Sequence, residues 1–321
     1  MHFAKSCLDL LLMSNNFRMI KAMHRQLYLL SLPMCAIVLS SCSSNKIEEG
    51  SKANQSSIQK SQVRDCAGDQ RDSATKRTVS VVPQLPQSKI YAYYWPLLEN
   101  IGQQTDICFK LKLAADIPEF EKLLESSEVD YAFMNPYHLV INKERYTPLI
   151  RDSNKLLTGI IVTSKVSSIQ NLQDIDGQEL YLPAPNAFGA SLLVRSYLSS
   201  QGIKPIVKYV KTHSNVYRNS IMNPDGAGGG VNNTLKRENP GVRQQIRIIK
   251  ETKGYPAHPF SSKSILPSNE QIKVQNAWLI LGENKANFQL LNKAQIPTPM
   301  KADYKKDYQQ LESLGLERYV Q

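Results

Sequence analysis

Short apolar runs alternate with longer segments that have apolar residues at helical spacing from about residue 78 onward. β-branched or alternating runs predict strands at 78–83, 107–113 and 129–134. Apolar positions at helical spacing predict helices at 88–101 and from the candidate N-cap Asp116 to Leu124. This order of elements predicts an α/β fold with a mostly parallel sheet.

The same alternation returns on a smaller scale after a strand at 158–163. The second series comprises strands at 179–183, 206–212 and 246–252 and helices at 189–200 and 214–222, and helices at 269–281 and 304–314 close the chain. We therefore expect two Rossmann-like lobes, the first formed by 78–160 plus 250–321 and the second by 161–249. Two chain crossings between such lobes make a cleft that can hinge around a ligand.

The first 41 residues have the pattern of an export signal. A basic segment at 19–25 precedes an apolar run at 27–39, which is too short to span a membrane. Leu39-Ser40-Ser41-Cys42 resembles a bacterial lipobox, in which Cys42 is acylated and becomes the mature N-terminus. The alternative is an ordinary export signal with a chance cysteine. We interpret residues 1–18 as an upstream start-site extension of this signal peptide.

Residues 42–77 are rich in Ser, Asn, Gln and Lys and have almost no apolar periodicity, so they predict a flexible tether. The expected product is an exported periplasmic or cell-surface lipoprotein, anchored to the membrane through Cys42. Cys66 in the tether and Cys108 in the globule can pair in an oxidising compartment or remain two free thiols. The sequence leaves both alternatives open.

The segment 184–191 has the pattern of an anion-binding loop. It follows the strand at 179–183 and opens the next helix, and unpaired N–H groups at a helix start attract anions. Asn135-Pro136-Tyr137 also joins a strand to a helix, at the carboxyl end where open α/β sheets bind ligands. Tyr137 can donate a phenolic hydrogen bond there, or act as a hydrophobic staple over the helix.

Composition and charge add little specificity. The chain is 41% hydrophobic and carries a formal charge of +11, which suits anionic ligands, membrane surfaces or nucleic acid. Its basic residues are scattered, which favours a solvated surface with a positive bias and no nucleic-acid partner. GxSxG and HExxH motifs are absent, and the globule has no paired Cys/His cluster. We therefore predict no enzyme activity, no metal site and no cofactor.

Several segments in a fixed order are similar to the phosphate/phosphite/phosphonate substrate-binding proteins of ABC importers, over about residues 78–281. In addition to the lipobox, these segments are 79–85, Tyr94-Trp-Pro-Leu97, 129–137, 172–177, the 184–191 loop, Gly202-Ile-Lys-Pro205, 212–216 and Tyr255-Pro-Ala-His-Pro259. The resemblance implies a type II periplasmic-binding-protein fold. It also implies a monomer that closes on a tetrahedral oxyanion and delivers it to an ABC permease.

By the same resemblance, ligand contacts are expected on both sides of the cleft. The expected residues are Tyr93, Tyr94, Tyr137, Asn186, Ala187, Gly189, Ala190, Ser191, His213 and Ser214. His213 and Ser214 begin a helix, so their imidazole and hydroxyl groups can meet the anion. Without the resemblance, His213 would be interpreted as a cap or a surface histidine.

The chain departs from this family in two places. The 186–191 loop has fewer hydroxyls than the usual Ser/Thr-rich form, so backbone N–H groups are expected to supply most hydrogen bonds. Glycines at 226–230 stand where the phosphonate binders carry an acidic residue, which argues against an aminophosphonate ligand. We interpret the glycines as a close approach of the backbone to the cleft, the alternative being a turn or tight packing.

A second functional class, a ligand-sensing lipoprotein that signals to a sensor protein, fits the same sequence.

Overall fold

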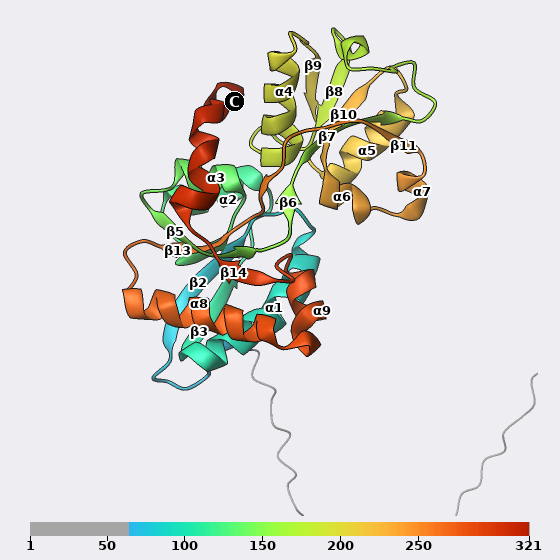
Figure 1. Ribbon diagram of the computed structural model, residues 1–321. Helices are drawn as coiled ribbons and strands as arrows, with labels where there is room; N and C mark the ends of the chain where they lie inside the picture. Colours follow the sequence, from blue (N-terminus) through green and yellow to red (C-terminus); the bar gives the residue numbers. More distant parts are fainter. Residues whose placement is uncertain (1–63, 321) are drawn as a thin grey trace, which may run out of the picture. The chain divides into compact units, whose positions relative to one another are not determined.

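A computed structural model describes residues 64–320, and two β-sheets with flanking helices organise this part of the chain. Figure 1 shows the larger sheet with the first and last parts of the chain and the smaller sheet with the middle part. The predicted signal peptide, Cys42 and most of the tether lie outside the described residues. None of the helices described is long and apolar enough to cross a membrane.

The larger sheet has the strand order β1-β3-β2-β4-β13-β5-β14. Only β3, β2 and β4 run parallel to one another, and the remaining pairs are antiparallel, so the prediction of a mostly parallel sheet is wrong for this lobe. The strands are β1 (Ala67–Gly68), β2 (Thr75–Val81), β3 (Ile107–Lys112), β4 (Tyr131–Phe133), β5 (Tyr146–Asp152), β13 (Phe260–Lys263) and β14 (Pro299–Lys301).

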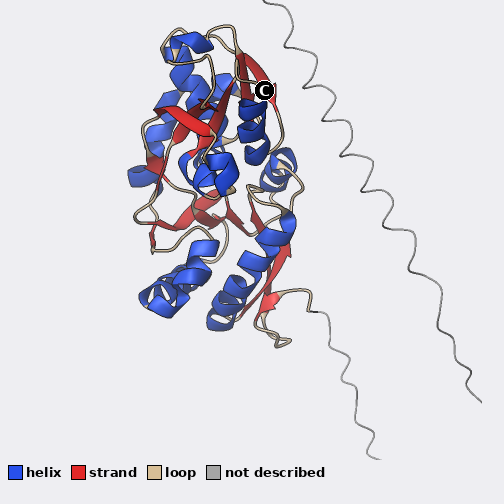
Figure 2. Ribbon diagram, turned by 90° about the vertical axis from the view of Figure 1, so that its right-hand side faces the viewer, coloured by secondary structure: helices blue, strands red, loops and turns tan. Residues whose placement is uncertain are grey.

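The helices of this first lobe pack on the larger sheet because their apolar faces join one core. Helices α1, α8 and α9 contact one another or the strands β3, β5 and β14. Figure 2 shows helices beside the strands of both sheets. The helices are α1 (Gln87–Thr105), α2 (Ile117–Glu125), α3 (Pro136–Ile141), α8 (Ser268–Glu283) and α9 (Phe288–Lys293). Asp116 caps α2, as predicted, because its Oδ1 accepts a hydrogen bond from the amide of Glu119.

The smaller sheet, with the strand order β11-β7-β10-β8-β9, forms the second lobe. Alternate residues of β7 face opposite helices: Ile161 joins the core cluster of α4, and Ile160 joins that of α5. The elements are β7 (Gly159–Ser164), η1 (Gln173–Ile175), β8 (Glu179–Leu182), η2 (Phe188–Leu193), α4 (Val194–Ser200), β9 (Ile206–Tyr209), α5 (His213–Met222), β10 (Ala227–Val231), α6 (Asn232–Lys236), α7 (Pro240–Arg243) and β11 (Ile246–Glu251).

Two short strands carry the chain between the lobes. The outgoing strand β6 (Leu156–Leu157) pairs antiparallel with the returning strand β12 (Tyr255–Pro256). Because β6 leads into β7 and β12 leads back to β13, the two lobes are joined by two crossings. The predicted fold class, two α/β lobes with a two-crossing hinge, is confirmed.

The last segment of the chain is less regular than predicted. The expected helix at 304–314 is a π-helical turn, η4 (Tyr304–Tyr308), followed by the 3-10 segments η5 (Gln309–Leu314) and η6 (Leu316–Tyr319). A further 3-10 turn, η3 (Lys285–Asn287), precedes α9. Segment η6 reaches the second lobe, where Arg195 donates to the carbonyl of Tyr319 at 2.5 Å.

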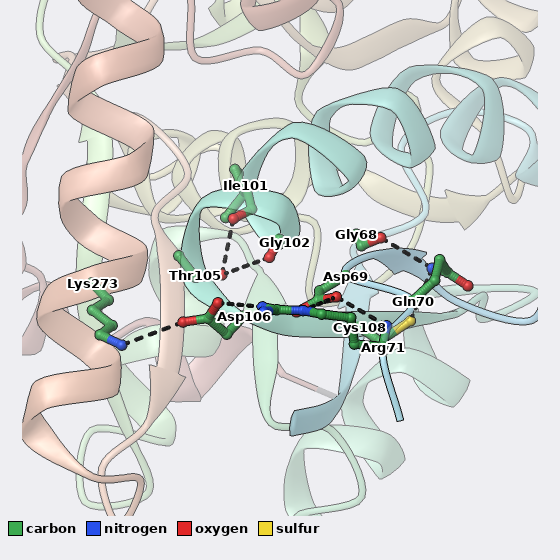
Figure 3. A network of polar contacts seen from close by, with 10 residues as sticks. All are labelled: Gly68, Asp69, Gln70, Arg71, Ile101, Gly102, Thr105, Asp106, Cys108 and Lys273. Atoms are coloured by element: carbon green, nitrogen blue, oxygen red, sulfur yellow. Dashed lines mark hydrogen bonds and ion pairs between the residues drawn. The ribbon is translucent and has the colours of Figure 1, made fainter. Parts of the chain in front are cut away.

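A disulfide joins Cys66 at the end of the tether to Cys108 on β3, with their Cα atoms 5.4 Å apart. A polar network surrounds this junction (Figure 3). Arg71 pairs with Asp69 and with Asp106, and Lys273 on α8 also reaches Asp106. Within the described residues, the tether therefore ends on the edge of the larger sheet, where it is held by a covalent bond and by these ion pairs.

Candidate functional site

A small cavity of about 20 Å³ lies where the two lobes meet. Its lining comes from the ends of strands and the starts of helices in both lobes, and no lining residue is acidic. The lining residues are Val82, Gln84, Ile117, Asn135, Leu157, Ala187, Phe188, Gly189, Ala190, His213, Val231 and His258. A volume of this size holds about one water molecule.

The first lobe contributes polar side chains from two adjacent parallel strands. Gln84 follows β2 and Asn135 follows β4, and Val81 pairs with Phe133 at the carboxyl ends of these strands. Parallel strands present their carboxyl ends at one edge of a sheet, which is where ligands bind in such folds. Asn135 caps α3 by accepting from the amide of His138 at 2.8 Å. The strand ends therefore place two side-chain amides at the cavity.

The predicted anion loop supplies the second lobe's wall. Ala187, Gly189 and Ala190 line the cavity, as does Phe188. The helix begins with a π-helical segment, η2, which continues directly into α4, whereas the sequence predicted one α-helix over 189–200. Within residues 64–320, the amides of Phe188, Gly189 and Ala190 have no hydrogen-bond acceptor. Three adjacent N–H donors at a helix start are suited to an anion.

Asn135 also connects the lobes at this point. Its Nδ2 donates to the carbonyl of Asn186 at 3.1 Å. The side-chain Oδ1 of Asn186 is buried and has no partner among the described residues. Asn186 directly precedes the lining residue Ala187 but is not itself part of the lining. This hydrogen bond joins the loops that follow β4 and β8 across the junction between the two lobes.

Two histidines, one from each lobe, line the cavity in their neutral form. His213 begins α5, and burial, aided by the charge of Arg237, lowers the pKa of its imidazole from 6.5 to about 4. Burial is the main cause that lowers the pKa of His258 from 6.5 to about 3. Each neutral ring offers one N–H donor and one acceptor.

Two buried atoms at the cavity lack hydrogen-bond partners among the described residues. They are Nδ1 of His213 and Oε1 of Gln84. The side-chain amide Nε2 of Gln84 contacts Nε2 of His258 instead. Buried polar atoms are seldom left unpaired, because the loss of hydration costs about 1–3 kcal/mol each. The unpaired atoms are therefore places where a bound molecule can form hydrogen bonds.

Some predicted contacts have their hydroxyl protons engaged elsewhere. Ser191 donates to the carbonyl of Ala184 at 2.6 Å, Ser214 donates to Glu238, and Tyr94 donates to the carbonyl of Ala294 at 2.9 Å. None of these three lines the cavity. A hydroxyl that donates to the protein cannot also donate to an anion, so these groups hold the loop, the helix α5 and the first core in place.

The remaining predicted tyrosines lie outside the cavity lining. Tyr137 is 5% exposed and belongs to the first lobe's core, and burial is the main cause that raises the pKa of its phenol. Tyr93 packs partly buried against the same core, with the ammonium of Lys293 6.0 Å from its ring centre. None of the three predicted tyrosines, Tyr93, Tyr94 and Tyr137, is therefore part of the cavity lining.

Gln84, Asn135 and His258 are polar residues of the cavity lining that sequence reasoning missed as ligand contacts. The strand-end position could have identified Gln84, because it follows β2 as Asn135 follows β4. His258 is contributed by the returning chain, in the segment Tyr255-Pro-Ala-His-Pro259 that belongs to the resemblance, but the sequence analysis did not assign it to the ligand. Among residues 64–320, no group of three His, Cys, Asp or Glu side chains is arranged to hold a metal ion.

The comparisons with known proteins agree with this geometry. Residues 79–308 match the family model described as the periplasmic substrate-binding protein of the phosphonate ABC transporter. No curated protein sequence matches the chain.

Three solved structures show the same fold. A binding protein component of an ABC phosphonate transporter from Pseudomonas aeruginosa has a TM-score of 0.67 at 14% identity, over 77% of this chain and 88% of its own. PhnD1 from Prochlorococcus marinus, in complex with methylphosphonate, has a TM-score of 0.67 at 14% identity, over 76% and 98%. A Xanthomonas citri protein bound to ATP has a TM-score of 0.62 at 15% identity, over 77% and 100%.

Proposed function

Because the chain belongs to the family of periplasmic substrate-binding proteins of phosphonate ABC transporters, we propose that it captures a phosphate-, phosphite- or phosphonate-type oxyanion between its two lobes. This family consists of solute-binding proteins and not of enzymes. Delivery of the anion to an ABC permease is part of the proposal, as is lipid anchoring through Cys42. A signalling lipoprotein of the same fold is the alternative, and no feature of the described residues favours it.

The observation that carries the proposal is the set of donors around the cavity. The three unpaired amides of 188–190 come from one side, and the neutral imidazoles of His213 and His258 come from the two lobes. Preorganised N–H donors with no competing carboxylate favour a small anion. Of the predicted contacts, Ala187, Gly189, Ala190 and His213 are the ones that we assign to the ligand.

The size of the cavity implies that the lobes move. A tetrahedral oxyanion is larger than the one water molecule for which the cavity has room, so the described state is too closed to admit it. Within residues 64–320, the main chain crosses between the two lobes at the paired strands β6 and β12. We propose that opening about these strands admits the anion and that closure brings the donors of both lobes onto it.

The test is ligand-dependent stabilisation of the purified chain. A ligand that binds only the folded state raises the melting temperature by mass action, by an amount equivalent to about 2.7 kcal/mol at 100 times its Kd. We expect methylphosphonate, phosphite or phosphate at millimolar concentration to raise the Tm, and sulfate and acetate serve as control anions. An unchanged Tm with all three phosphorus oxyanions contradicts the proposed ligand class.

A further inference from the structure

The last segment of the chain, from η4 to η6, is anchored to the first lobe. Leu316 is 1% exposed and belongs to the first lobe's core. Tyr308 donates to the carbonyl of Ala257 at 2.9 Å, and Asp307 forms an ion pair with Arg151 on β5 at 2.9 Å. These contacts fix the segment to the lobe that contains the larger sheet.

The end of the same segment contacts the second lobe. Segment η6 lies against α4, as Figure 1 shows, and against η2, the helix start that carries the unpaired amides. Nη1 of Arg195 on α4 donates to the carbonyl of Tyr319 at 2.5 Å, and the guanidinium carbon lies 5.5 Å from the centre of the Tyr319 ring. One arginine of the second lobe therefore holds one residue of the first-lobe segment by a charged hydrogen bond and a cation–π contact.

Arg195 is oriented for this contact from within its own lobe. The same Nη1 donates to the phenol oxygen of Tyr209, at the end of β9, at 2.9 Å. Tyr319, by contrast, packs partly buried against the first lobe's core. When the lobes separate, the bond between Arg195 and Tyr319 must therefore break, unless η6 is pulled off that core. The bond between Arg195 and Tyr209 can stay intact.

This contact spans the junction that must open to admit a ligand. The cavity at the junction has room for about one water molecule, so an anion enters only after the lobes separate. Because η2 continues directly into α4, the helix held by Arg195 is also the helix whose start lines the cavity. A contact that is made in only one of two conformations shifts the population towards that conformation.

We propose that Arg195 and Tyr319 form a latch that holds the ligand-free protein closed and thereby limits how fast the anion enters. The inference rests on the proposed function, because it concerns access to the same cavity. The latch does not contact the ligand and acts through the population of the open conformation. Breaking the latch therefore speeds association, whereas damage to the binding site would weaken or slow it.

The test compares latch variants with the unsubstituted full chain, purified in detergent. Arg195→Met keeps an apolar stem but removes the charge and every N–H donor. Arg243→Met is the matched control, because Arg243 on α7 donates to the carbonyl of Lys236 at 3.2 Å, within the second lobe. Tyr319→Leu is a second latch variant, which removes the ring but keeps the backbone carbonyl.

Hydrogen exchange of the ligand-free proteins, followed by mass spectrometry, measures the opening. A hydrogen bond to a charged group changes an equilibrium by about 10- to 100-fold, so Arg195→Met should raise the exchange rate of the η2 amides by about 10-fold. Tyr319→Leu should raise it less, and Arg243→Met should leave it unchanged. Equal η2 exchange in Arg195→Met and Arg243→Met overturns the inference. Faster exchange in β8 and β10 as well also overturns it, because that result indicates a loosened second lobe and not a released latch.

Phosphorus NMR of methylphosphonate measures the association rate, when the exchange broadening of its signal is combined with a calorimetric Kd. We expect the association rate constant to rise about 10-fold in Arg195→Met and to be unchanged in Arg243→Met. Arg195→Lys, which retains a cationic donor, should lie between Arg195→Met and the unsubstituted chain. Unchanged or slower association in Arg195→Met contradicts the latch and leaves the proposed function standing. If the unsubstituted chain binds neither methylphosphonate nor phosphate, the proposed function fails, and hydrogen exchange still tests the latch.

Discussion

At the scale of single residues, the candidate site depends on groups that are kept neutral or left unpaired by burial. His258 is 4% exposed, and its Nε2 contacts the side-chain amide of Gln84. A protonated ring would lose hydration without gaining a carboxylate partner. The site therefore holds uncharged imidazoles. Each can donate one N–H hydrogen bond to an anion and can accept one from a protonated ligand oxygen.

Acid should destabilise the protein through these histidines. The pKa of His258 is lowered from 6.5 to about 3, so between these values the unfolded chain binds more protons than the folded one. The contribution of neutral His258 to the free energy of unfolding is fully present above about pH 6.5, and it is lost as the pH falls towards 3. We expect the Tm to drop from pH 7 to pH 4, and to drop less steeply in His258→Gln.

The difference between the two proteins isolates His258 from the carboxylates. Glu270 and Asp174, whose pKa values are lowered in the fold, lose their contributions as the pH falls in both proteins alike. Parallel Tm profiles for His258→Gln and the unsubstituted chain, measured by calorimetry, would show that His258 is not buried in its neutral form.

At the scale of elements, the strand β10 shows why glycine is needed where helical segments pack closely on a sheet. The sequence interpretation placed the glycine run at 226–230 against the cleft, but Gly228, Gly229 and Gly230 do not line the cavity. A Cβ atom at each of these three positions would come closer than 3.0 Å to η2 or α5. The glycines therefore allow two helical segments to pack directly on the strand, and this is the tight-packing alternative.

Gly229→Ala should disturb both stability and binding. Its Cβ would lie closer than 3.0 Å to the carbonyl oxygen of Ala190, a backbone atom that can move only together with the π-helical segment. Overpacking of this kind costs about 1–3 kcal/mol, which lowers the Tm. Since Ala190 lines the cavity, methylphosphonate affinity should fall as well.

The matched control for this substitution is Gly241→Ala on α7. At that position the nearest atom to a Cβ is Oδ1 of Asn239 at 3.4 Å, an ordinary contact. We expect its Tm and affinity to match those of the unsubstituted chain, or its Tm to rise slightly because alanine favours helix. Equal behaviour of Gly229→Ala and Gly241→Ala in calorimetry would contradict the packing argument.

At the scale of the whole molecule, the disulfide that holds the tether and the cavity proposed to capture the anion lie in different parts of the chain. The disulfide between Cys66 and Cys108 fastens the end of the tether to the larger sheet, at the edge strand β1 and its neighbour β3. The cavity is lined by strand ends and helix starts of both lobes. Disulfides persist in oxidising compartments, which agrees with the periplasmic family.

The proposed anchor gives a prediction at this scale. Cys42→Ser removes the thiol that would be acylated, so the protein should move from the membrane fraction to the soluble periplasmic fraction. Mass spectrometry of the unsubstituted chain should show a lipidated N-terminal cysteine. Cys35→Ser, which changes a cysteine within the apolar run of the leader, is the control. A soluble distribution of the unsubstituted chain would contradict anchoring through Cys42.

The sequence by itself determined the features that depend on local pattern. Apolar periodicity located most strands and helices, Asp116 marked the start of α2, and strand, turn and helix at 179–200 identified the segment with unpaired amides. The order of the motifs predicted the two-lobed fold. These features are readable because each depends on residues that are neighbours in the chain.

Only the tertiary structure decided which of the candidates meet at one cavity. It brought Gln84, His213 and His258 together from segments far apart in the sequence, and it engaged the hydroxyl protons of Ser191, Ser214 and Tyr94 with protein acceptors. Burial, hydrogen-bond partners and pKa values depend on contacts between residues that are far apart in the sequence, so no local sequence pattern predicts them.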